Sequence, residues 1–427
     1  MSSILLSFVG NQDPGSEGTD TEGSIVTLTK HLLEQNHKIK GAILLYTSGT
    51  EDAAVFTKEW LLSEVEQLSI APEQIELIPV DEKLSQDPVD LLLATQEAKK
   101  AIALAQEKLQ SGDRLELNSS SGTPAMKSSW SIVQASGLAP NSHLWQVRNP
   151  KKMLPEQERV FESDITVLKK TIDIQTIKKQ IACHNYNGAL ITFKNSNLID
   201  NGISNLLQCA SLRLSSAFKA SFEKIEKHAK FCGDRFHQQS KNLAARQHQE
   251  IIKEIYFQAE IKAKNQEYSE VLVKIFVFQE SVLFYLLKQK LLPKQDINLV
   301  MNENLSNKLD LAIANYRNGE LKRYLNNYKL NGDRQLILSN GYNRTVMTAI
   351  IEYLCGKDAE IYQLLKKLDV DCQKRNDYIH QLKGISKLES QETTSNMRQI
   401  LKVLKINIKP NPFEEINQKI DDLLNVL

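Results

Sequence analysis

The chain has 427 residues, of which 41% are hydrophobic and 25% are charged, and its formal net charge is +1. This length allows two or three domains, and the composition is typical of a soluble globular protein. No apolar run is long enough to span a bilayer, and the N-terminal apolar segment is too short for a signal peptide, so we expect a cytoplasmic protein with no membrane partner. The five cysteines are dispersed without metal-ligand spacing, which favours reduced thiols over a zinc site.

The small net charge hides an asymmetry between the two ends of the chain. Residues 1–165 contain 14 Lys and Arg against 24 Asp and Glu, whereas the remainder contains 39 against 28. A basic C-terminal part suits a polyanion such as RNA, because neutralising phosphates supplies most nonspecific affinity. The alternative is that long helices carry solvated lysines on their outer faces.

Short apolar segments alternate with helical periodicity over the first 160 residues. We predict strands at 4–9, 42–46, 75–80, 115–117 and 144–147, and helices at 25–34, 51–68, 89–109 and 125–135. This alternation predicts an α/β Rossmann-like domain, in which a parallel sheet is covered by helices on both faces.

From about residue 164 onward the periodicity is almost entirely helical. Apolar helical stretches are predicted at 251–292 and 345–368, and a short helix at 413–427, whereas the Asn-Gly pair at 187–188 predicts a turn. Gln, His, Lys and Arg are enriched around 235–250, which indicates a boundary within this part. We therefore divide the chain into an α/β domain at 1–164, a helical linker module at 165–245 and a second all-α domain at 246–427.

Three polar loops follow predicted strands at the sheet edge where ligands of open α/β sheets bind. Their candidate ligand-binding residues are Gly10, Asn11, Gln12 and Asp13 after the first strand, Thr47, Ser48 and Gly49 after the second, and Ser120, Ser121, Gly122 and Thr123 after the fourth, with Met126 in the helix that follows.

The third loop gives the strongest local signal. Thr123 is a good N-cap, Pro124 fits the first helical position, and Gly137 falls where the helix should end. A helix N-terminus at the ligand edge can hold phosphate without Lys or Arg. The alternative is a well-capped turn that binds nothing. Neither a Walker-type phosphate loop nor the GxGxxG fingerprint is present, so an ATPase or a nicotinamide oxidoreductase would lack its usual motif.

The segment 374–380 carries the chemistry expected of a metal-independent ribonuclease. Arg375, Asn376 and His380 place a permanent cation, an amide and an imidazole within six residues of a helix or its end. Histidine can serve as general base or acid, and arginine matches phosphate oxygens. The alternative is a surface arginine and a histidine beside a helix C-terminus. Positions five apart on an ideal helix are about 140° apart, so a helix end, a bend or a second subunit must complete such a site.

Other catalytic patterns carry less weight. Residues 260–262 resemble half of a metal-dependent nuclease motif, but they lie in helical rather than strand periodicity. The GxSxG and HExxH patterns are absent.

Four motifs in chain order resemble a known family: FVGNQDP after the first strand, LLYTSGT after the second, LNSSSGTPAM at the fourth, and RNDYIH near the end. The whole chain is similar to the ancillary ribonucleases of type III CRISPR antiviral systems. These join a CRISPR-associated Rossmann fold (CARF) domain to a HEPN domain (named for higher eukaryotes and prokaryotes nucleotide-binding). Arg375, Asn376 and His380 match the HEPN signature, which places the HEPN ribonuclease domain at 246–427.

The resemblance implies a homodimer whose CARF domains bind one cyclic oligoadenylate, of four or six nucleotides, as an allosteric activator. It implies that two Arg/His pairs form a composite endonuclease site. This site would cut single-stranded RNA to 2′,3′-cyclic phosphate ends without a metal cofactor. The protein would not associate stably with the interference complex, the CRISPR assembly that recognises foreign RNA. His380 would be the acid/base group, Arg375 would stabilise the phosphorane, and Asn376 would orient His380 or the phosphate. Asn11, Asp13 and the 121–123 turn would line the activator pocket, and Asn11 and Thr123 would assist any cleavage of the activator.

Two other functions stay open at this point. A CARF-type sensor without catalysis would signal to a partner through its helical half. An unrelated Rossmann enzyme would turn over a nucleotide-like metabolite. The sequence does not fix the ring size of the activator or the RNA sequence preference.

Overall fold

The computed structural model describes residues 2–16, 21–64, 70–196, 198–228, 232–293, 303–330, 334–338, 341–381 and 385–427, without the side chains at 16, 21, 64, 166, 228, 303, 304 and 373–381. It divides into two compact units, Met1–Asp173 and Ile174–Leu427, and the division lies within α6 (Thr166–Ala182). We refer to them as the N-terminal unit and the helical unit. Among the described residues, no helix is both long and apolar enough to cross a membrane.

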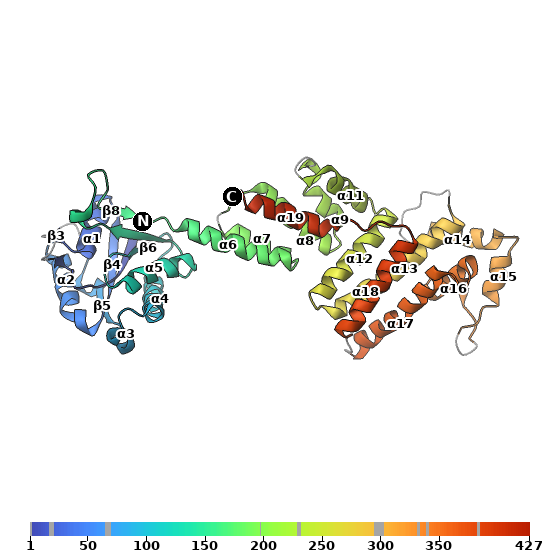
Figure 1. Cartoon of the computed structure of the whole chain (residues 1–427), viewed down its shortest axis with the longest axis horizontal. Helices are drawn as coiled ribbons and strands as arrows, with labels where there is room; N and C mark the ends of the chain where they lie inside the picture. The colour runs from blue at the N-terminus through green and yellow to red at the C-terminus, as the bar shows by residue number, and fades with distance from the viewer. Residues whose placement is uncertain are drawn as a thin grey trace. The chain divides into compact units, whose positions relative to one another are not determined.

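The N-terminal unit is built on a six-stranded sheet in the order β5-β4-β1-β6-β7-β8 (Figure 1). The strands are, in that order, Ile75–Pro79, Lys38–Tyr46, Ser2–Phe8, Arg114–Asn118, Ser142–Val147 and Val160–Glu162. The chain adds β4 and β5 on one side of β1 and then crosses to the other side for β6 and β7. The strand order therefore reverses at β1, and the sheet edge beside β1 and β6 is the expected ligand site of such a fold.

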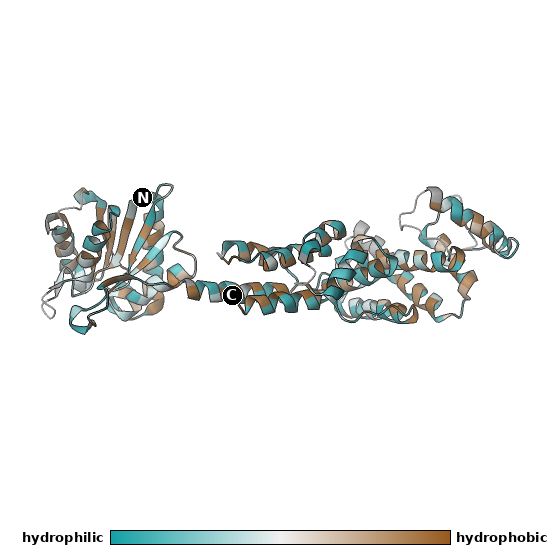
Figure 2. Cartoon of the chain, turned by 90° about the horizontal axis from the view of Figure 1, so that it is seen from above, coloured by the Kyte–Doolittle hydropathy of each residue, from teal (hydrophilic) through white to brown (hydrophobic). Residues whose placement is uncertain are grey.

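Helices cover both faces of this sheet. Helices α1 and α2 pack on one face, and α4 and α5 pack on the other. Their bounds are Ser24–Glu34, Glu51–Glu64, Leu91–Lys108 and Pro124–Ala135, and the short α3 spans Glu82–Gln86. In β1, Ile4, Leu6 and Phe8 face α4 and α5, whereas Leu5 faces α1 and α2. The apolar strands of Figure 2 thus have both faces buried. The predicted Rossmann-like fold is confirmed.

The five predicted strands pair in parallel, but the sheet has a sixth strand that was not predicted, β8, which pairs with β7 in the antiparallel direction. A parallel return needs a crossover that usually contains a helix. The connection 148–159 contains only the short 3-10 turn η3 (Pro150–Lys152), so the chain folds straight back along β7. A two-stranded hairpin, β2 (Gly15–Ser16) and β3 (Thr21–Glu22), lies apart from the main sheet.

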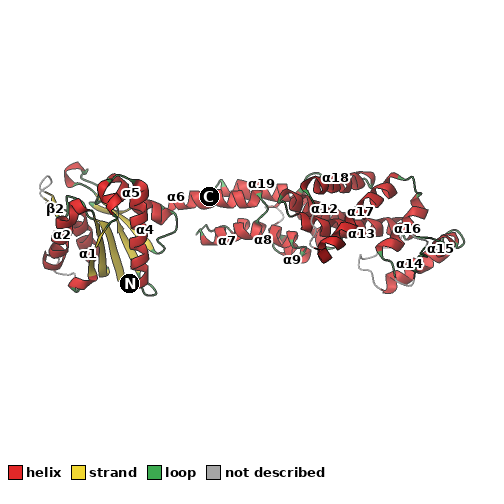
Figure 3. Ribbon diagram, turned by 90° about the horizontal axis from the view of Figure 1, so that it is seen from below, coloured by secondary structure: helices red, strands yellow, loops and turns green. Residues whose placement is uncertain are grey.

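The helical unit contains the end of α6 and the helices α7 to α19 (Figure 3). The first six are α7 (Tyr186–Asn195), α8 (Asn201–Leu214), α9 (Phe218–Glu223), α11 (Asp234–Ala244), α12 (His248–Lys264) and α13 (Tyr268–Leu291). They are followed by α14 (Glu303–Asn315), α15 (Glu320–Asn326), α16 (Arg344–Cys355), α17 (Glu360–Gln381), α18 (Lys387–Val403) and α19 (Pro412–Leu424). One cluster of buried residues extends through this unit, from Ile177 to Leu424. The division of this part at 245/246 stays a prediction.

Three local expectations for this part need correction. The stretch 251–292 is two helices, α12 and α13, separated where Gln266 adopts a φ of 62°. The stretch 345–368 is likewise divided into α16 and α17, at Gly356 with a φ of 91°. The Asn187–Gly188 pair is not a turn but lies in the first turn of α7, because the Asn185 side chain caps that helix by accepting from the Gly188 N–H at 3.0 Å.

A buried ion pair joins α8 to α12 in the core of the helical unit. Arg213 donates from Nε and Nη2 to the two carboxylate oxygens of Glu254 at 2.8 and 2.7 Å, and the side chains are only 2% and 1% exposed. The pair is bidentate, and the Arg213 carbonyl also accepts from Gln258 Nε2 at 2.9 Å. Removing one partner would leave the other charge buried without compensation.

We predict that Arg213→Met lowers the free energy of unfolding of the helical unit by about 3–5 kcal/mol, and that the double substitution Arg213→Met/Glu254→Leu recovers most of that loss. Urea denaturation followed by circular dichroism at the helix band measures this. All three tryptophans, Trp60, Trp130 and Trp145, lie in the N-terminal unit, so the tryptophan fluorescence transition is an internal control that should not move. A double variant as unstable as Arg213→Met would contradict the role of the pair.

Candidate functional site

The three predicted loops meet in one cavity of about 570 Å³ at the edge of the sheet beside β1 and β6. All twelve residues predicted to bind a ligand line it: Gly10, Asn11, Gln12, Asp13, Thr47, Ser48, Gly49, Ser120, Ser121, Gly122, Thr123 and Met126. The sequence reasoning missed six further lining residues, which are Val9, Ser24, Thr50, Ser85, Pro88 and Lys127. The structure thus brings the predicted set together, while its binding role stays a prediction.

Two glycines let the loops after β1 and β6 approach each other. A Cβ atom on Gly10 would lie 2.8 Å from the Gly122 backbone nitrogen, too close for any other residue. Gly122 itself has a φ of +86°, and a Cβ there would lie 2.9 Å from the sulfur of Met126. Both positions therefore require glycine, one for space and one for its backbone conformation as well.

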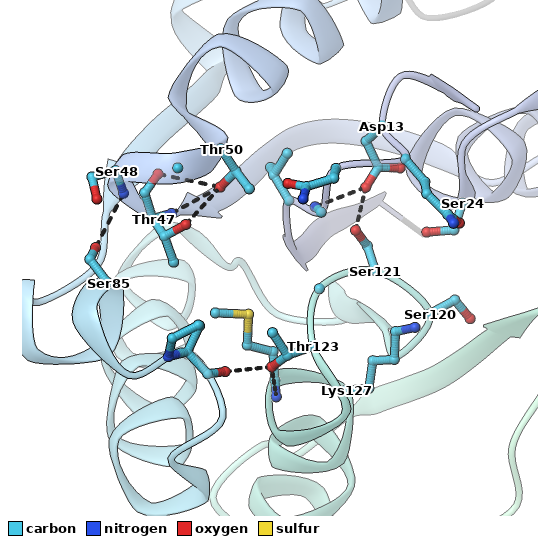
Figure 4. A pocket seen from close by; sticks show the side chains of 18 residues that line it. Asp13, Ser24, Thr47, Ser48, Thr50, Ser85, Ser120, Ser121, Thr123 and Lys127 are labelled. Atoms are coloured by element: carbon cyan, nitrogen blue, oxygen red, sulfur yellow. Dashed lines mark hydrogen bonds between the residues drawn. The ribbon is translucent and has the colours of Figure 1, made fainter. Parts of the chain in front are cut away.

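Asp13 fastens these loops from within. Its carboxylate accepts from the Gly10 N–H at 3.1 Å and from the hydroxyl of Ser121 (Figure 4), and it also accepts from the Ile25 N–H at 3.3 Å. The side chain is 4% exposed, and this burial raises the pKa of the carboxyl above its usual value. Asp13 thus joins the β1 loop, the start of α1 and the β6 loop, which makes it a positioning residue. Asn11 and Gln12 beside it are exposed.

Two capped helix starts border the cavity. The Thr123 hydroxyl accepts from the Met126 N–H at 3.3 Å and donates to the Pro88 carbonyl at 2.6 Å, which confirms Thr123 as the N-cap of α5. On the opposite wall, the Thr47 N–H donates to the Thr50 hydroxyl at 3.0 Å at the start of η1 (Ser48–Thr50), which leads into α2. Free N–H groups and the positive ends of helix dipoles favour an anion at such places.

Lys127 supplies a cation that the sequence analysis did not assign to this site. It lies in the first turns of α5, and Figure 4 shows its side chain on the same side of the cavity as Ser120. Its charge acts on Asp13, whose pKa it lowers in opposition to burial. Among the lining residues it is the one lysine or arginine. The signal was present in the sequence, because Lys127 directly follows Met126 in the capped helix.

The residues predicted to cut RNA lie on α17, whose backbone is helical through position 381. The side chains of Arg375, Asn376 and His380 lie outside the described residues. The continuous helix puts positions 375 and 380 about 140° apart around its axis. The completion of such a site by a second copy of the chain stays a prediction.

Buried polar contacts fix α17 just before this segment. Gln279 on α13 is fully buried and donates to the Leu365 carbonyl at 2.9 Å and to Asp369 Oδ1 at 2.8 Å, and it accepts from Cys372 Sγ at 3.1 Å. Thr393 on α18 donates to Asp371 at 2.8 Å. These bonds set both the rotation and the register of the helix that carries position 375.

The remaining candidate patterns do not form a metal centre. Residues 260–262 lie on α12 as predicted, and Glu260 accepts from Tyr256 and, at 2.6 Å, from Arg398. In the part of the chain that the structure describes, no three His, Cys, Asp or Glu side chains gather to hold a metal ion. The expectation of metal-independent cleavage stays a prediction.

The fold was compared with those of known proteins. No family model and no curated protein matches the chain. A solved structure of Enterococcus italicus Csm6 bound to cyclic hexa-2′-fluoro-hexa-dAMP matches over 100% of both chains, with a TM-score of 0.64 and 15% sequence identity. The chain therefore shares the fold of that protein along its entire length, including the order of an α/β unit followed by helices.

The close approach of the two loops generates a prediction about Gly10. Gly10→Ala should destabilise the N-terminal unit by about 1–3 kcal/mol, because its Cβ meets backbone that lacks room to move. Gly49→Ala is the matched control for stability, since its Cβ would meet only Thr47 Oγ1, at 3.9 Å. Thermal unfolding followed by tryptophan fluorescence compares the two, and equal midpoints would contradict the close packing of the loops.

Proposed function

We propose that this chain is a cyclic-oligoadenylate-activated endoribonuclease of type III CRISPR antiviral defence. The observation that carries the proposal is the combination of two features in one chain. Its full-length fold matches that of a protein bound to a cyclic hexanucleotide, and the twelve motif residues line one cavity at the ligand edge of the sheet. The Arg375/His380 segment on α17 carries the residue types that metal-independent RNA cleavage uses.

The cavity suits part of a ring of adenylates. Helix starts at α5 and η1, together with Lys127, offer positive charge to phosphates, while small hydroxyl side chains leave the backbone accessible. A volume of about 570 Å³ is in the range that holds one drug-sized ligand, which is less than four or six nucleotides. Two cavities that face each other in a homodimer would share one ring, and this supports the dimer as the binding form.

RNA cleavage would follow from proton transfer and charge stabilisation at the dimer's composite site. A base removes the proton from the 2′-hydroxyl, whose oxygen attacks the adjacent phosphorus, and the 5′-oxygen leaves with a proton from the acid. His380 serves as the proton-transfer group. Arg375 stabilises the negative charge on the phosphorane, and Asn376 orients His380 or the phosphate. The products are a 2′,3′-cyclic phosphate end and a 5′-hydroxyl end, and no metal ion takes part.

Cleavage of the activator in the same cavity is the finer part of the proposal. The Thr123 hydroxyl gives its hydrogen to the Pro88 carbonyl and its lone pair to the helix cap, so it is already engaged. Asn11 is exposed in the cavity and has a side-chain amide that can orient a 2′-hydroxyl for in-line attack. Of the two sequence candidates, these contacts favour Asn11.

The test of the catalytic assignment is cleavage of a fluorescent single-stranded RNA reporter in EDTA, with and without cyclic tetra- or hexa-adenylate. We expect cleavage with one ring only, and a loss of at least about a hundredfold in His380→Ala, because general acid–base groups contribute about 10²–10⁴-fold. His237→Ala, on α11, is the matched control and should cleave at the wild-type rate. Full activity in His380→Ala would remove the assignment, and no cleavage by the folded wild-type dimer would favour a non-catalytic sensor.

A second prediction concerns Lys127. If it contacts a ring phosphate, Lys127→Ala should weaken activator binding by about tenfold to a hundredfold, since a hydrogen bond to a charged group contributes about 1.5–3 kcal/mol. Titration calorimetry with the activating ring measures the dissociation constant. Lys99→Ala, an exposed lysine on α4 away from the cavity, is the control. Equal affinity in the two variants would exclude Lys127 as a phosphate ligand.

A further inference from the structure

A row of four tyrosine rings lies on the helical unit around α15. The ring centroids of Tyr316 and Tyr353 are 6.2 Å apart, those of Tyr353 and Tyr324 are 4.9 Å apart, and those of Tyr324 and Tyr328 are 5.5 Å apart. All four side chains are half-buried, so each ring keeps some of its surface open to solvent. We call these four residues the tyrosine row.

One buried carboxylate holds part of this row in place. Glu352 is 5% exposed and accepts from the hydroxyls of Tyr324 and Tyr328 at 2.8 Å each, and also from Tyr362 at the start of α17. Burial opposes ionisation of Glu352, but the three tyrosine hydroxyls and Lys357 outweigh it and hold its pKa below the usual value. The rings of Tyr324 and Tyr328 are therefore fixed before anything binds, which reduces the entropy lost when a ligand stacks on them.

Cations surround the tyrosine row. The segment 316–329 contains four Lys or Arg, three Tyr and one carboxylate. Arg317, Lys322 and Arg323 are exposed, and among the described residues no carboxylate lies within salt-bridge distance of them. Tyr324 and Tyr328 also line a cavity of about 440 Å³ with the amide of Asn327. Arg323 Nη1 donates to the Asn318 carbonyl at 3.3 Å, and the Arg317 guanidinium lies 5.7 Å from the Tyr316 ring centroid, so neither contact neutralises the charge.

We propose that the tyrosine row and its flanking cations bind single-stranded RNA at a distance from the cleavage segment. Aromatic faces that stack bases, interleaved with cations that hold the phosphates, are the physical requirements of single-strand binding. Double-stranded RNA hides its base faces in the stack, and it fits this surface less well. The surface extends the proposed ribonuclease function, on which it rests, by giving the substrate a second point of attachment.

The distance along α17 between the Glu352 cluster and the cleavage segment determines the role of the tyrosine row in RNA cleavage. Tyr362 contacts the Glu352 cluster, and position 380 follows 18 residues later on the same helix, about 27 Å along its axis. A strand held at the tyrosine row would therefore reach the cleavage segment only after several nucleotides. The row orients and retains the strand, and it contributes no group to the reaction.

The test is binding of a short single-stranded RNA with 2′-O-methyl groups, which supply no attacking hydroxyl, to the full-length protein over a range of salt concentrations. Each phosphate contact to a single strand contributes about 0.7 to the slope of log K against log salt. Lys322→Ala/Arg323→Ala should reduce that slope by about 1.4. The control Lys241→Ala/Lys402→Ala removes the same charge from exposed positions on α11 and α18 and should leave the slope unchanged.

Stacking is tested separately at Tyr316. Tyr316→Leu should weaken binding about tenfold, whereas Tyr316→Phe, which keeps the ring, should bind like the wild type. Duplex RNA of the same length should show no such difference. If both Tyr316 variants bind alike and the two charge variants have equal slopes, the tyrosine row does not hold RNA.

Cleavage of an unmodified RNA, measured in parallel, separates this inference from the proposed function. If the Lys322/Arg323 and Tyr316 variants cleave RNA and also bind it as tightly as the wild type, the inference is overturned and the ribonuclease assignment stays intact. Binding that is lost in the row variants of a protein that never cleaves RNA would support the surface and reject the ribonuclease.

Discussion

The N-terminal unit depends on one close approach, in which the loops after β1 and β6 meet backbone to backbone at Gly10 and Gly122. The reversal of strand order at β1 makes these loops neighbours, although more than a hundred residues separate them in the chain. Asp13 then fastens them to each other and to α1. The cavity, its two helix starts and Lys127 all follow from that arrangement, because each is carried by one of the joined segments or by the neighbouring strand β4.

The helical unit uses the same device of a buried polar group between elements. Glu352 ties the start of α17 to the tyrosine row, and Gln279 ties the middle of α17 to α13. A single helix thus connects the proposed RNA surface to the segment with Arg375 and His380. The buried pair of Arg213 and Glu254 joins α8 to α12 in the same core. Each of these contacts is costly to break on one side only, so they specify one arrangement of the helices.

Periodicity and turn chemistry predicted the five parallel strands and the four long helices of the α/β unit, and twelve of the eighteen residues that line the cavity, because the carboxyl ends of parallel strands meet at one edge. Contacts between segments that are distant in the sequence could not be predicted from periodicity or turn chemistry. The role of Asp13 depends on Ile25 and Ser121, and the antiparallel β8 depends on the lack of a crossover helix. Lys127 was not predicted, because the acidic composition of the unit favours phosphate binding by backbone groups. The breaks at Gln266 and Gly356 lie in short polar stretches between apolar helical segments, and a positive φ at each position separates the two helices.

The central claim is that occupation of the cavity in the N-terminal unit controls RNA cleavage by the helical unit. Its most direct test is the rate of RNA cleavage as a function of cyclic oligoadenylate concentration, alongside calorimetric binding of the same ring to the same protein. The account predicts no cleavage without the ring and half-maximal cleavage at the dissociation constant of the ring. An RNA cleavage rate that stays the same from zero to saturating ring, while calorimetry shows the ring to be bound, would contradict it.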